Sequence, residues 1–224
     1  MFWIIPDVLG SNDLEFVQAS FARLTWRDGG STAGVRARTV KQNEQADTSA
    51  PLGRTIVERV MKAIKAQDVI RAAARPHKYS PLLISRTSDG GQYGPHIDNA
   101  IMADGTMRSD LSFTLFLSEE ASYEGGALCL DLPAGIQSIK LPAGSLVLYP
   151  TTLVHWVEPV TDGVRHAAIG WIQSLVPDAH ERDILFDLDT ARADLRAREP
   201  AESPALLTLD KVYSNLLRKW SRLS

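Results

Sequence analysis

The sequence predicts a mainly β protein with flanking helices, whose core is a sandwich or jelly roll of two sheets. From Tyr79 to Leu175 the chain contains short apolar and β-branched runs, separated by glycine and proline at short intervals. The segments before and after this stretch have the three- and four-residue apolar spacing of amphipathic helices. The length of 224 residues and the 44% hydrophobic content suit one large domain, or one domain with an appendage.

Residues 1–77 are expected to form an N-terminal helical region that packs on the core. One helix is expected over about 11–24 and a second over about 52–74, because apolar residues recur on one face of each. Between them, residues 29–50 are rich in Gly, Ser, Thr, Asn and Gln, which indicates an exposed connection of low regularity with a strand-like run at 35–40.

Residues 78–178 contain the predicted strands of the core. Glycine and proline separate runs of the length and composition typical of strands in a jelly roll. The eight runs are 82–86, 94–99, 111–117, 127–130, 136–141, 145–149, 154–160 and 165–175.

Residues 179–224 are expected to form a C-terminal helical extension. Apolar residues recur at helical spacing over 181–198 and again over 206–223. Such helices can lie on the core or bind a second copy, so the sequence leaves a homo-oligomer formed through them open.

Charge and composition exclude several classes of partner. The 24 basic and 27 acidic residues give a net charge of −3, so no overall basic field favours nucleic acid. The sequence predicts neither a signal peptide nor a membrane-spanning run, and Cys129 is the single cysteine. We therefore expect a cytoplasmic protein with no membrane partner.

The segment from Gly94 to Asn99 contains the clearest chemical signal. On a strand, His96 and Asp98 would project from the same face, which delivers an imidazole and a carboxylate side by side. Alone, a His-x-Asp pair is more often an ordinary hydrogen-bonding pair than a metal site. A third ligand must come from elsewhere in the chain.

His155 and Arg165 complete a more specific pattern. His155 begins a predicted strand 59 residues after His96, far enough along the chain for intervening strands to return it to the first pair. Arg165 opens a strand so apolar that burying its guanidinium requires an anion, and the planar guanidinium suits a carboxylate. Two histidines and a carboxylate leave three positions open on ferrous iron. A molecule that chelates iron at one end and offers a carboxylate to Arg165 at the other has the shape of 2-oxoglutarate.

These residues resemble a known family. His96-x-Asp98, His155 and Arg165, with Trp171 downstream and the glycine pair at 125–126, look like the Fe(II)- and 2-oxoglutarate-dependent dioxygenases of the prolyl 4-hydroxylase type. The run from Trp171 to Ser174, followed by Arg182 to Asp189, is similar to bacterial PKHD-type hydroxylases.

The resemblance implies a double-stranded β-helix that binds Fe(II) through His96, Asp98 and His155, with Arg165 holding the distal carboxylate of 2-oxoglutarate. It also implies a co-substrate site that includes Tyr93, Thr114 and Trp171. Phe116 stands where the wider family has a polar tyrosine, so part of the co-substrate's hydrogen bonding must differ here. Residues 102–107 follow the metal-binding segment and are a candidate lid.

The implied activity is hydroxylation of a substrate with O2, with decarboxylation of 2-oxoglutarate to succinate and ascorbate as reductant. The substrate is open between a small molecule such as a siderophore-like compound and a protein or peptide side chain. Two alternatives share the metal site: a nucleic-acid demethylase, which the net charge disfavours, and a non-catalytic cupin-like metal-binding module, which would have no need of Arg165.

Overall fold

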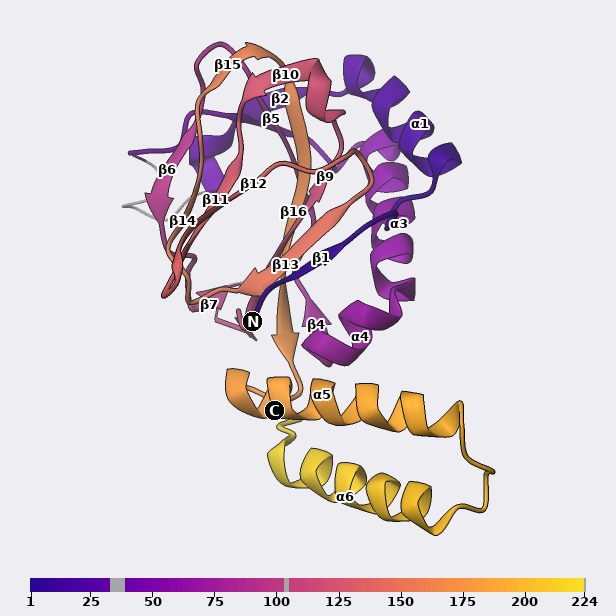
Figure 1. Cartoon of the computed structure of the whole chain (residues 1–224). Coiled ribbons are helices and arrows are strands. Elements are labelled where there is room, and N and C mark those ends of the chain that lie inside the picture. Colours follow the sequence, from indigo (N-terminus) through magenta and orange to yellow (C-terminus); the bar gives the residue numbers. More distant parts are fainter. Residues whose placement is uncertain (33–38, 103–104, 224) are drawn as a thin grey trace.

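Two facing β-sheets with helices on one side form the body of the protein, and a helical hairpin extends from it (Figure 1). The computed structural model describes residues 1–32, 39–102 and 105–223. The strand-like run expected at 35–40 lies largely outside these residues, as does the centre of the candidate lid at 102–107. On either side of that centre, β7 (Ile101–Met102) pairs with β8 (Met107–Arg108).

The larger sheet contains eight strands and runs through the middle of the molecule. Its order is β1 (Trp3–Ile5), β13 (Leu146–Pro150), β9 (Leu111–Phe116), β16 (Arg165–Ser174), β5 (Leu83–Thr87), β3 (Glu44–Ala46) and β2 (Trp26–Asp28), with β4 (Pro76–Tyr79) paired to β16.

The smaller sheet faces the larger one and has the order β12 (Gly135–Ile139), β11 (Leu128–Leu132), β14 (His155–Val157) and β6 (Tyr93–His96). A short antiparallel pair, β10 (Tyr123–Gly125) with β15 (Val160–Gly163), joins this end of the fold. All eight runs expected as strands between 82 and 175 overlap strands of the structure.

The large sheet separates two apolar cores. Its helix-facing side packs on Ile56, Val60 and Ile64 of α3 (Pro51–Ala66) and on Val17 of α1 (Ser11–Ser20). Its other side faces the small sheet across a second core. Alternation along β9 sends apolar side chains to the helices and Ser112 and Thr114 to the interior between the sheets. Polar groups therefore reach the space between the two sheets.

Residues 1–77 supply more than helices. The helices α1, α3 and α4 (Asp68–Ala74) match the expected segments, but β1, β2 and β3 of this region join the large sheet. The expectation of an exposed, irregular connection over 29–50 is wrong at β3, where Gln45 is buried and pairs with Ser85. Backbone pairing with β5 on one side and β2 on the other, rather than an apolar pattern, holds this strand near the sheet edge.

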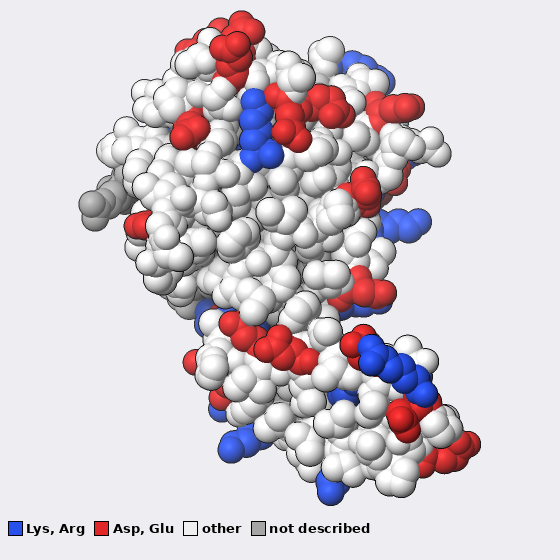
Figure 2. All heavy atoms as spheres, in the orientation of Figure 1, with Lys and Arg blue, Asp and Glu red and all other residues white. Residues whose placement is uncertain are grey.

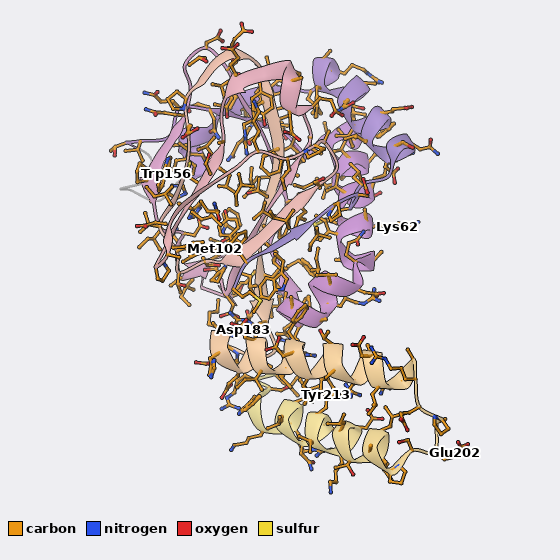
Figure 3. The ribbon with its side chains drawn as sticks, in the orientation of Figure 1. Lys62, Met102, Trp156, Asp183, Glu202 and Tyr213 are labelled. Atoms are coloured by element: carbon orange, nitrogen blue, oxygen red, sulfur yellow. The ribbon has the colours of Figure 1, made fainter. Side chains whose placement is uncertain are left out.

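The C-terminal helices α5 (Ala179–Arg196) and α6 (Pro204–Trp220) form an antiparallel pair below the sheets (Figure 1). Arg75, at the end of α4, docks the pair by donating to the Leu185 carbonyl at 3.0 Å and to Asp189 at 2.8 Å. Tyr213 lies between the two helices (Figure 3), and Arg192 stacks on its ring with 3.8 Å to the centroid.

The distribution of charged side chains on the surface agrees with the small net charge of the sequence. Acidic and basic side chains are interspersed on the face shown in Figure 2, with no continuous basic area there. Across the described residues, none of the helices combines the length and the apolar character that crossing a membrane requires.

Candidate active site

His96, Asp98 and His155 converge between the sheets. Strand β6 ends at His96, and the antiparallel pairing of β6 with β14 places His155 directly opposite it. The Nε2 atoms of His96 and His155 lie 3.7 Å and 3.6 Å from the two carboxylate oxygens of Asp98. One donor atom from each of the three residues lies within 4.8 Å of the others. This donor set suits a divalent first-row metal and leaves coordination positions open.

Backbone carbonyls fix the two imidazoles for metal binding. The Nδ1 of His96 lies 2.8 Å from the Gly94 carbonyl, and the Nδ1 of His155 lies 3.1 Å from the Leu153 carbonyl. A carbonyl only accepts, so each Nδ1 carries a proton, and Nε2 is the ring nitrogen that faces Asp98 and can bind a metal. Burial, followed by the neighbouring His155, lowers the pKa of His96 to about 4, which keeps its ring neutral near neutral pH.

Two donors hold the Asp98 carboxylate. The Ser112 hydroxyl and the Trp171 indole N–H both donate to Oδ2 of Asp98, each at 2.8 Å. Ser112 and Trp171 are direct partners in the pairing of β9 with β16, so one register places both donors. Trp171 was expected near the co-substrate; the structure additionally places its N–H on a candidate metal ligand.

Arg165 is buried in the same cavity with unmet hydrogen-bonding capacity. Its side chain is 2% exposed, and no described residue accepts from its Nε or Nη2. The guanidinium lies over the Phe116 ring, 5.2 Å from the centroid, so the residue expected in place of a polar tyrosine offers a π face instead. Burial lowers the pKa of Arg165. A buried guanidinium with two nitrogens that lack acceptors is costly, and an anion in the cavity would supply the missing acceptors.

The cavity that contains these groups has a volume of about 370 Å³. Tyr93 lies against the metal ligands, since its ring stacks on His96 with 3.6 Å between centroids. Thr114 lines the wall next to Tyr149. Tyr149 was not identified from the sequence, because a buried aromatic residue on a strand is indistinguishable from a core residue. Also missed were three polar wall residues from the N-terminal region, namely Lys41, Asn43 and Gln45.

The donor chemistry fits ferrous iron and a dicarboxylate together. Two histidines and a carboxylate suit Fe(II), and the unpaired Nε and Nη2 of Arg165 suit a carboxylate in the same cavity. These are the features of a metal-dependent oxygenase that uses an anionic co-substrate.

Comparison with known families gives the class. Residues 82–173 match the family model described as the 2OG-Fe(II) oxygenase superfamily, and residues 179–222 match the PKHD-type hydroxylase C-terminal domain. The first match contains both metal-binding strands and β16. The second coincides with the helical pair α5 and α6.

Curated relatives extend the match over the whole chain. A PKHD-type hydroxylase of Hyphomonas neptunium is 49% identical over 97% of this chain and 98% of its own length. A PKHD-type hydroxylase of Synechococcus elongatus is 44% identical over 99% of this chain and 100% of its own. The chain belongs to the PKHD-type hydroxylases, a family of Fe(II)- and 2-oxoglutarate-dependent dioxygenases.

A solved structure confirms the fold. The prolyl hydroxylase of Trichoplax adhaerens, in complex with a hypoxia inducible factor peptide fragment, superposes with a TM-score of 0.60 at 18% identity, over 82% of this chain and 86% of its own. The expected double-stranded β-helix with C-terminal helices is thereby confirmed.

Proposed function

We propose that this enzyme hydroxylates a small molecule such as a siderophore-like compound, or a protein side chain, with Fe(II) held by His96, Asp98 and His155. The observation that supports this best is the buried Arg165, whose Nε and Nη2 lack acceptors in the cavity that contains the three metal-ligand candidates. A metal-binding module without a co-substrate would gain nothing from that guanidinium.

In this proposal the chain's own residues bind and orient. Arg165 holds the distal carboxylate of 2-oxoglutarate, Thr114 and Tyr93 line its site, and Trp171 with Ser112 orients Asp98. Bound Fe(II) would supply the oxidative chemistry: 2-oxoglutarate loses CO2 and takes up one atom of O2 to become succinate, and the other oxygen atom enters the substrate as a hydroxyl group. The apolar walls around Arg165 exclude water, which strengthens its attraction for a carboxylate.

We further propose that ascorbate restores ferrous iron, that the protein is cytoplasmic, and that the chain divides at about 78 and 178. The nucleic-acid alternative gains no support from the net charge of −3 or from the mixed charges of Figure 2. The whole-chain match to hydroxylases favours an enzyme over a cupin-like binding module.

Two measurements test the proposal. Anaerobic Fe(II) and 2-oxoglutarate should together give the wild-type protein a weak visible charge-transfer band, which an Arg165→Ala variant should lack. Untargeted metabolite turnover with Fe(II), 2-oxoglutarate, O2 and ascorbate should then reveal a compound that gains one oxygen atom as succinate forms. A well-loaded wild-type protein with no band and no succinate would refute the proposal.

A further inference from the structure

The glycine pair singled out in the sequence lies next to Arg165. Strand β10 ends at Gly125 and pairs with β15, at the end of the fold remote from α5 and α6 (Figure 1). Gly126 has a φ of 65°, and a Cβ at this position would lie 3.0 Å from Cδ of Arg165 and 3.1 Å from Cε2 of Tyr123. The missing side chain leaves a space that Tyr123 and Arg165 share, so these two residues are neighbours.

Tyr123 brings a buried hydroxyl to this place. The residue is 3% exposed, and no described residue forms a hydrogen bond with its Oη. Lys140 covers its ring, with Nζ 4.0 Å from the centroid, and donates to the Tyr123 carbonyl at 2.7 Å. Burial raises the pKa of Tyr123, and the charge of Arg165 acts next and in the opposite direction. The hydroxyl is therefore protonated near neutral pH and interacts electrostatically with the guanidinium.

Unmet hydrogen-bonding capacity is concentrated at these two residues. Six buried side-chain polar atoms lack a partner in the described part of the chain, and three of them are Oη of Tyr123 and Nε and Nη2 of Arg165. A guanidinium only donates, so it cannot accept the proton of the hydroxyl. Three unpaired atoms in one place are costly, and a single group that accepts from all of them would remove the cost. A carboxylate has two oxygens with about four lone-pair positions, which is enough for these donors.

Resting on the proposed function, we propose that Tyr123 is a second residue that binds the distal carboxylate of 2-oxoglutarate, through a hydrogen bond that its hydroxyl donates beside Arg165. The assignment also accounts for Phe116, which offers the guanidinium only a ring, 5.2 Å from the centroid, where the wider family has a polar tyrosine. Phe116 lies on β9 and Tyr123 on β10, so the hydroxyl reaches Arg165 from a different strand.

Tyr123 is placed to act on one end of the co-substrate. Arg165 lines the cavity, whereas Tyr123 lies against Arg165 without lining the cavity itself. Its hydroxyl can therefore meet a group that is bound to Arg165, while the metal ligands lie on β6, on β14 and at Asp98. Loss of the hydroxyl should weaken the binding of molecules with a distal carboxylate and leave the binding of molecules without one unchanged.

Calorimetry on the protein loaded with Zn(II) tests this with two ligands. 2-Oxoglutarate has the distal carboxylate, and 2-oxovalerate has a methyl group in its place on the same chain. Tyr123→Phe removes only the hydroxyl, and Tyr79→Phe is the matched control, because Tyr79 packs on the helix-facing core and does not line the cavity. We expect Tyr123→Phe to weaken 2-oxoglutarate binding about tenfold, as for one charge-assisted hydrogen bond, and to leave the affinities for 2-oxovalerate and Zn(II) unchanged. Tyr79→Phe should change none of the three.

The outcomes separate this proposal from the function on which it rests. Equal 2-oxoglutarate affinity in wild type and Tyr123→Phe would overturn it, and so would an equal loss for both ligands, which would indicate a general distortion of the cavity. Thermal unfolding without metal or ligand is a second readout, because removal of an unpaired buried hydroxyl should not lower the midpoint. A lower midpoint would show that the hydroxyl has a partner within the protein and would also overturn the proposal. Failure of 2-oxoglutarate to bind wild type, or binding that does not depend on Arg165, would instead refute the proposed function.

Discussion

Replacing Trp171 with phenylalanine tests whether hydrogen bonds to Asp98 set the metal affinity. The substitution keeps an aromatic ring on β16 and removes the indole N–H that donates to Oδ2 of Asp98 at 2.8 Å. The Ser112 hydroxyl still donates to the same oxygen at 2.8 Å. The carboxylate therefore loses one of two donors and gains rotational freedom.

The size of the effect follows from these contacts. A hydrogen bond to a charged group contributes about 1.5–3 kcal/mol, and loss of a group that orients a metal ligand costs roughly 10–100-fold in affinity. Because Ser112 remains in Trp171→Phe, we expect the lower figure, about a tenfold weaker metal affinity. The double variant with Ser112→Ala should approach about a hundredfold loss.

Competition between the protein and a chromophoric chelator for Zn(II) measures this affinity directly. Trp156→Phe is the matched control, because Trp156 lies on β14 next to His155 (Figure 3) but does not line the cavity. Thermal unfolding of the metal-free variants separates a loss of packing from a loss of metal affinity. If Trp171→Phe binds Zn(II) as tightly as Trp156→Phe, the indole does not orient Asp98 and the reasoning fails.

Three further substitutions have defined outcomes. Arg165→Met should raise the free energy of unfolding of the metal-free protein by about 1–3 kcal/mol in urea titrations, since it removes a buried cation whose Nε and Nη2 lack acceptors. It should also abolish 2-oxoglutarate binding in calorimetry, and a destabilised variant would contradict this. Burial lowers the pKa of His166 from 6.5 to about 4, so between these pH values the unfolded chain binds a proton that the folded chain does not. The free energy of unfolding should therefore fall by roughly 3 kcal/mol as the pH drops from 6.5 to about 4. His166→Gln should flatten that dependence, and an unchanged slope would count against it. Arg75→Met should cost about 2 kcal/mol and speed proteolysis between β16 and α5, because it removes the bonds that dock the helical pair; equal cleavage rates would refute this role.

The sequence predicts the strands of this fold well because their ends carry explicit signals. Glycine and proline border the runs that became β5, β12 and β13, and the alternation on β9 places Ser112 and Thr114 on one face. The spacing of His96 and Asp98 needs only local geometry, so that pair could be identified even though β6 ends at His96. Arg165 stood out because a cation on an apolar strand demands a partner.

Other parts of the site depend on pairings that lie far apart in the chain. The bond from Trp171 to Asp98 follows from the register of β16 against β9, which no local pattern reveals. Residues 40–46, which bring Lys41, Asn43 and Gln45 to the cavity wall, were missed for a related reason. Their strand β3 lies near the sheet edge and is held by backbone hydrogen bonds, so the polar composition of residues 29–50 gave no strand signal.

The contribution of the N-terminal region decides which fragments of this chain can be studied. The match to the oxygenase superfamily begins at residue 82, yet a fragment that starts there would lack the strand β1 and the cavity-lining residues Lys41, Asn43 and Gln45. Loss of β1 would leave the backbone groups of β13 unpaired along the whole outer margin of the sheet, which favours association between copies. Such a fragment would tend to aggregate, and its active-site cavity would lack the wall that contains Lys41.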